Sequence, residues 1–165
     1  MRSKLLVAIG LTPLMLVASG ASATAFSDIS VPANAGWFDS GVVISADDVL
    51  SISATGSASP NGVDNFNGPD GDGGDCATCI ALVPNSRYAL VGRIGAAGTP
   101  FLIGSSFSAT VSESGSLFLG FNDDYFGDNA GSFLVSGSVV PEPSTGLLLG
   151  TGLLGLAMRR GGRRT

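Results

Sequence analysis

Apolar and polar residues alternate in short runs through the middle of the chain. Residues 49–53 read Val-Leu-Ser-Ile-Ser, and residues 132–139 alternate in a similar way. Successive side chains of a β-strand point to opposite faces of the sheet, so a period of two predicts strands with one buried face. Similar short runs occupy residues 41–45, 89–94, 100–104, 106–111 and 116–121. Seven or eight short strands with no helical period between them predict an all-β fold, an antiparallel β-sandwich.

The N-terminus has the pattern of a secretory signal peptide. Arg2 and Lys4 form a basic start, and an apolar stretch follows at residues 5–17. Ala23-Thr24-Ala25 is a small-residue cleavage site, with Ala21-Ser22-Ala23 as a near alternative. We expect the signal peptide to cover residues 1–25, and the mature chain to begin at Phe26 or Thr24. Export would place the protein in an oxidising compartment.

The C-terminus has three parts in a fixed order. Pro141, Glu142 and Pro143 are followed by an apolar run at residues 146–158 and then by four arginines. The two prolines favour an extended, exposed segment that a protease can reach. The apolar run is shorter than the ~20 residues of a full membrane span. It is still apolar enough to insert as a short transmembrane helix, with the arginines held on the cytoplasmic side. A buried core helix is the alternative, but it would not need the arginines.

This tail resembles that of the PEP-CTERM sorting family of exported bacterial proteins. Val140-Pro141-Glu142-Pro143 carries the resemblance, together with the apolar run and the arginines after it. The resemblance implies anchoring in the inner membrane through the C-terminal helix and cleavage by a sorting protease. The protein would then reach the cell surface or the extracellular matrix. The expected segments are a signal peptide at 1–25, a β-sandwich at 26–139 and a sorting segment at 140–165.

The charge between these two ends is strongly acidic. Residues 26–140 hold eleven Asp and one Glu against two Arg, a net charge of −10. Nucleic acid and anionic membrane surfaces are therefore poor partners, whereas a cation is a good one. The chain has no His, which excludes Ser-His-Asp and Cys-His catalysis and the usual zinc sites.

One loop, residues 122–131, gathers several oxygen ligands. Asp123, Asp124, Asp128 and Asn129 lie within seven residues, and Gly127 permits a tight turn. Carboxylate, amide and backbone carbonyl oxygens are the ligands that Ca²⁺ prefers. The pattern is consistent with a calcium site, or with the solvated Asp and Asn turns that are common in β-proteins.

A second loop, residues 59–79, is long, acidic and rich in Gly. It contains Asp70 and Asp72, but it lacks the final Glu and the flanking helices of an EF-hand. It ends in Cys76-Ala77-Thr78-Cys79. A redox role would need a helix in a βαβ setting, and zinc would need further ligands, so we favour a local disulfide.

The loop at 122–131 resembles the calcium loop of the galactophilic bacterial lectins of the PA-I type. Weaker similarities occur in the family's order along residues 33–40, 44–59, 68–72 and 89–95. The resemblance implies a jelly-roll-like β-sandwich with one Ca²⁺, through which sugar hydroxyls bind. Position by position, it gives the side chains of Asp123, Asp128 and Asn129 as metal ligands, with the backbone carbonyl of Tyr125.

Other positions of that family are matched less completely. A further carbonyl ligand would come from near Pro60 or Asn61, and the loop is about two residues shorter here. Asp70 and Asp72 fall in the stretch that resembles the first binding loop, and with Asp124 they are the expected ligand-binding residues. The His and Gln that contact sugar in the family have no counterpart in this chain.

These features predict an exported, non-enzymatic protein that binds a polysaccharide or other glycan through calcium. A structural surface or matrix protein, in which calcium only rigidifies loops, is the alternative. A hydrolase ranks third: Asp123 and Asp124 are paired carboxylates, but adjacent loop residues rarely face one substrate.

Overall fold

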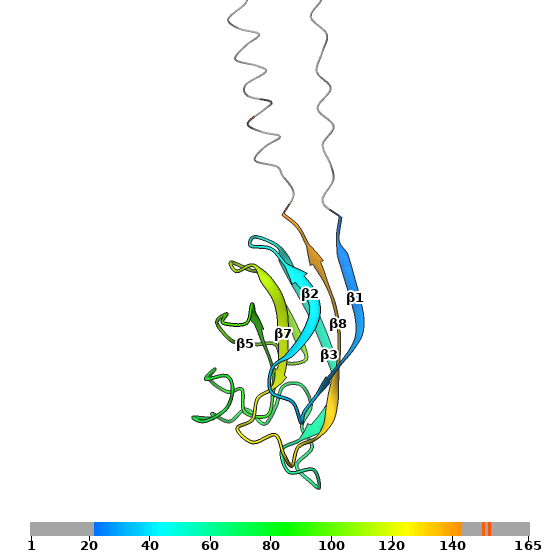
Figure 1. Cartoon of the computed structure of the whole chain (residues 1–165). Coiled ribbons are helices and arrows are strands. Elements are labelled where there is room, and N and C mark those ends of the chain that lie inside the picture. The colour runs from blue at the N-terminus through cyan, green and yellow to red at the C-terminus, as the bar shows by residue number, and fades with distance from the viewer. Residues whose placement is uncertain (1–21, 143–149, 151, 153–165) are drawn as a thin grey trace, which may run out of the picture. The chain divides into compact units, whose positions relative to one another are not determined.

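In the part of the chain that the structure describes, eight strands form two four-stranded antiparallel sheets (Figure 1). The computed structural model describes residues 22–142, 150 and 152. The first sheet has the order β1 (Thr24–Pro32), β8 (Ala130–Val140), β3 (Val49–Ser59), β6 (Ser106–Thr110). The second has the order β2 (Phe38–Ile44), β7 (Gly115–Phe121), β4 (Leu90–Ile94), β5 (Phe101–Leu102). The predicted antiparallel β-sandwich is confirmed.

The core lies between the sheets and is built from alternate residues of their strands. Leu50 and Ile52 of β3 are buried, and so are Leu117, Leu119 and Phe121 of β7. All belong to one cluster of apolar side chains. Burying a side chain of this size stabilises the fold by about 1.5–3 kcal/mol. The apolar positions of the alternating pattern are thus the positions whose side chains fill the core.

Seven of the eight strands fall where the alternation predicts them. The pattern does not reveal β1, because a bulge interrupts it: the register shifts between Phe26 and Ile29, and Asp28 has a φ of 57°. The strand also begins at Thr24, so it includes the last two residues of the expected signal peptide, Thr24 and Ala25.

Strand β8 connects the two ends of the sandwich. The loop at 122–131 runs into its first residues, and Pro141 and Glu142 follow its last residue. Its 11 residues span about 35 Å at a rise of roughly 3.3 Å per residue. The oxygen-rich loop and the start of the sorting motif therefore lie at opposite ends of the sheet.

Three of the predictions fall outside the described residues. They are most of the signal peptide, Pro143 of the sorting motif and most of the apolar run at 146–158. Within the described residues, no helix has the length and apolar character that a membrane crossing requires.

Candidate metal and carbohydrate site

The loop at 122–131 joins β7 to β8 and is anchored by a buried amide. The Asn122 side chain is fully buried and makes four hydrogen bonds, to Ala81 and Ser86. Its Oδ1 accepts from the Ala81 N–H at 2.9 Å, and its Nδ2 donates to the Ser86 carbonyl at 2.9 Å. The backbone of Asn122 also pairs with Tyr88 and Ala89. Asn122 therefore fixes the start of this loop to the segment at 81–89.

Asp123, the next residue, carries a buried carboxyl group. It is only 6% exposed. Burial raises the pKa of this carboxyl group, and repulsion from Asp124 and Asp128 adds to the shift. The Asp124 N–H and the nearby Asn129 amide partly oppose it. A carboxylate in this position is short of compensating charge.

Asn129, at the other end of the loop, presents an unpaired oxygen. The residue is 8% exposed, and its Nδ2 donates to the Ala33 carbonyl at 3.1 Å. Its Oδ1 is buried without a hydrogen-bond partner. An unpaired buried acceptor costs about 1–3 kcal/mol, so a ligand for this oxygen is expected. The bond to Ala33 leaves that oxygen free to bind a cation.

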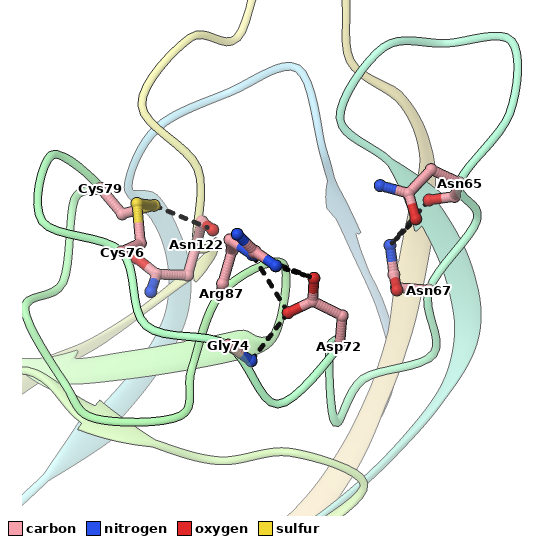
Figure 2. Close-up of polar contacts among 8 residues, drawn as sticks. All are labelled: Asn65, Asn67, Asp72, Gly74, Cys76, Cys79, Arg87 and Asn122. Atoms are coloured by element: carbon pink, nitrogen blue, oxygen red, sulfur yellow. Dashed lines mark hydrogen bonds and ion pairs between the residues drawn. A yellow bond between two sulfur atoms is a disulfide. The ribbon is translucent and has the colours of Figure 1, made fainter.

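The tip of the loop at 59–67 packs against the loop at 122–131. Gly62 has a φ of +72°, and a Cβ placed on it would come within 2.7 Å of the Asp128 carbonyl oxygen. The buried Ser59 hydroxyl holds this tip by accepting from the Gly62 N–H at 3.0 Å and donating to the Asp64 carbonyl at 2.5 Å. Farther along, Asn67 donates to the Asn65 carbonyl at 2.7 Å (Figure 2). The segment expected to supply a further carbonyl ligand thus lies beside Asp128.

The residues of this loop suit a hard cation such as Ca²⁺. They offer the carboxylates of Asp123 and Asp128, the unpaired Asn129 oxygen and backbone carbonyls, and Ca²⁺ binds about six to eight such oxygens. Across the described residues, no three Asp, Glu or Cys side chains gather closely enough to hold a metal. A site here would therefore depend on neutral oxygens as well as on two carboxylates. Asp128 and Tyr125 are exposed.

The three predicted ligand-binding aspartates are hydrogen-bonded to other parts of the protein. Asp70 accepts from the Ser105 N–H at 2.7 Å. Asp124 accepts from the Thr78 hydroxyl at 2.6 Å. The structure therefore ties each of them to a protein group, and a role in ligand binding stays a prediction.

Asp72, the third of them, forms an ion pair with Arg87 at 2.6 Å (Figure 2). The Arg87 guanidinium holds the pKa of the Asp72 carboxyl below its usual range, and the Gly74 N–H contributes. The other cation of residues 26–140, Arg93, lies 4.4 Å from the Trp37 ring centroid and 5.2 Å from that of Phe118. Trp37 thus packs under an arginine, a cation–π contact.

A disulfide joins Cys76 and Cys79, whose Cα atoms are 5.5 Å apart. The Cys79 sulfur lies 3.4 Å from the Asn122 carbonyl oxygen (Figure 2). Because a disulfide sulfur carries no proton, this is a packing contact. The Ile80 N–H donates to the Asp123 carbonyl at 3.2 Å. The segment around the disulfide therefore supports the start of the 122–131 loop, a role that Cys spacing alone does not indicate.

Comparison with known proteins finds a family and a solved structure that match the β-sandwich. A family model described as PA-IL-like protein matches residues 27–141, and one described as PEP-CTERM protein-sorting motif matches residues 139–164. The first match covers most of the chain, which therefore belongs to the PA-IL-like family. Both resemblances seen in the sequence are confirmed.

A similar solved structure is described as "EclA N-terminal domain; PllA-like lectin". It shares 28% sequence identity with this chain, and the match covers 70% of this chain and 97% of that one, with a TM-score of 0.55. A search of curated protein sequences gives no match.

Proposed function

We propose that this protein is exported and binds carbohydrate through a calcium ion held by the loop at 122–131. The observation that carries the proposal is the buried, unpaired Oδ1 of Asn129, in the same loop as the desolvated Asp123 carboxyl. A bound dication would satisfy the first and neutralise the second. Membership of the PA-IL-like family and the likeness to a PllA-like lectin support it.

The residues that would hold the ion are Asp123, Asp128 and Asn129 through their side chains and Tyr125 through its carbonyl. A calcium ion supplies open coordination positions that two vicinal sugar hydroxyls can fill. The carboxylates of Asp123 and Asp128 would then accept hydrogen bonds from the same hydroxyls. Charge-assisted bonds of this kind are roughly twice as strong as neutral ones.

Exposed apolar side chains in the two loops offer a surface for the apolar face of a sugar ring. Phe66 is 54% exposed and Tyr125 is 65% exposed. Their loops meet where Gly62 contacts Asp128. Asp124, Asp70 and Asp72 each already accept hydrogen bonds from a protein group. We therefore propose Phe66 and Tyr125 as sugar-contacting residues ahead of Asp124, Asp70 and Asp72.

The sorting motif supports delivery to the cell surface. We propose that the β-sandwich is carried by a sorting segment at 140–165, anchored through its apolar run and then cut by a sorting protease. The candidate site lies at the opposite end of β8 from Pro141, about 35 Å away at the usual rise per residue. That separation would leave the site free for glycan while the chain is still anchored.

A glycan array with and without chelator tests the proposed function. With calcium, the wild-type protein is expected to bind a defined set of glycans, and EDTA is expected to abolish that binding. Asp128→Ala removes an exposed proposed ligand, so we expect about 100-fold weaker binding or more. Asp39→Ala is the matched control, because it removes an exposed carboxylate of β2 that lies outside both loops; its binding should stay close to wild type.

Two outcomes would count against the proposal. Glycan binding that survives EDTA would show that calcium is not needed for the binding. Stabilisation by calcium with no glycan bound would favour the alternative, a structural surface protein whose loops calcium rigidifies.

A further inference from the structure

The sequence offers two sites for removal of the signal peptide, and they differ by two residues. One is the bond between Ala23 and Thr24, and the other is the bond between Ala25 and Phe26. From the strand pairing, we propose that the mature chain begins at Thr24. This inference is independent of the proposed calcium and carbohydrate binding.

The hydrogen-bonded ladder of the first sheet begins at Thr24. Thr24 pairs with Val139, Ala25 pairs with Ser138, and Phe26 pairs with Gly137. Ser22 and Ala23 precede the strand and are exposed. A cut after Ala25 would therefore remove the first two pairs of β1, whereas a cut after Ala23 removes none.

Thr24 and Ala25, which a cut after Ala25 would remove, cover the end of β8. On one side β8 pairs with β3 up to Val140 opposite Val49, and on the other side only Thr24 and Ala25 cover Val139 and Ser138. Without them, the last residues of β8 would become an open edge directly before Pro141. Exposed edge strands invite pairing with other chains.

Phe26 gives a second reason, because its side chain packs against the core. A Cβ placed on Gly137 would come 2.7 Å from the Phe26 Cζ, so the ring lies over that glycine. As the first residue of the chain, Phe26 would carry a charged amino group and would fray, as chain termini do. With Thr24 as the first residue, two paired residues separate the terminus from this aromatic contact.

A start at Thr24 also places the new amino terminus next to the sorting motif. Thr24 lies opposite Val139, two residues before Pro141. Figure 1 shows the beginning of β1 and the end of β8 side by side. The two processing sites of the chain therefore lie at one end of the sandwich, away from the 122–131 loop.

The test is to export the full-length chain from a bacterium and to identify its first residue by mass spectrometry of the N-terminal peptide. We expect Thr24. Ala25→Gln spoils only the later site, because a large residue replaces the small one before that bond. It should leave the start at Thr24. Ala21→Gln spoils only the earlier site and should leave the chain uncut or cut after Ala25.

Two results would overturn the proposal. One is a wild-type chain that begins at Phe26. The other is an Ala25→Gln chain that retains its signal peptide while Ala21→Gln is processed normally. Ala25 is exposed at the start of β1, so a glutamine there is compatible with the folded sheet.

Discussion

Asn122→Ala is expected to destabilise the protein by about 4 kcal/mol, because it leaves several buried partners unpaired at a cost of roughly 1–3 kcal/mol each. The substitution removes four side-chain hydrogen bonds to Ala81 and Ser86. No water can replace them without opening the segment, since Asn122, Ala81 and Ser86 are all buried. For a domain of this size, we expect the melting temperature to fall by about 15 °C.

The control for this prediction is Asn34→Ala. Asn34 is an exposed asparagine between β1 and β2, and its substitution should change the melting temperature by only about 2 °C or less. The measurement is thermal unfolding followed by circular dichroism. An Asn122→Ala protein that melts within a few degrees of wild type would show that the segment at 81–89 is held mainly by other contacts.

Asp123→Asn is expected to change stability in opposite directions with and without calcium. In chelator near pH 7, the neutral amide relieves the cost of a buried carboxylate that Asp124 and Asp128 repel. We expect it to raise the melting temperature by about 5 °C. In calcium, the wild type should gain about 2.7 kcal/mol when calcium exceeds its dissociation constant about 100-fold. That gain is roughly 10 °C, and the variant should lack most of it.

The same substitution predicts a pH dependence in chelator. The pKa of Asp123 is raised in the folded protein, so the folded state holds this proton more tightly than the unfolded chain. The resulting stability is fully present below the unfolded pKa of about 3.9. It is lost as pH rises through the higher folded pKa. The gain from Asp123→Asn should therefore appear only above about pH 4 and level off beyond the folded pKa.

Calorimetric or optical melting of the wild type and of Asp123→Asn across pH measures this difference in stability directly. Asp39→Asn is a suitable control, because Asp39 is exposed in β2 and lies outside the 122–131 loop. If Asp123→Asn lowered the stability in chelator, the carboxylate would be stabilised by its surroundings, and the case for a compensating cation would fail.

The strands could be predicted from sequence because each one has a single buried face. The alternation of Leu50 and Ile52 with serines indicates which face of β3 is buried in the core. Where the pairing is irregular, the pattern weakens. The bulge after Phe26 hides β1, and the register shift between Asp39 and Val43 hides the first residues of β2.

The proposed metal ligands could be identified from sequence because they share one short loop. Asp123 and Asn129 are six positions apart, and their chemistry is visible in the chain itself. The support for that loop could not be foreseen, since Asn122 and Ser86 are 36 residues apart and meet only in the folded protein. For the same reason, the bonds of Asp124 to Thr78 and of Asp70 to Ser105 were not evident. The sequence groups Asp70, Asp72 and Asp124 as residues that bind one ligand, whereas the fold pairs each of them with a different protein group.

Isothermal titration of the purified protein with calcium tests the central claim most directly. At pH 7 we predict binding of one ion per chain, and near-complete loss of that binding in Asn129→Leu, which removes the buried unpaired oxygen. Because Asn129→Leu also removes the bond to Ala33, its fold must be verified by circular dichroism. A folded wild-type protein that shows no calcium binding at millimolar concentration would contradict the account.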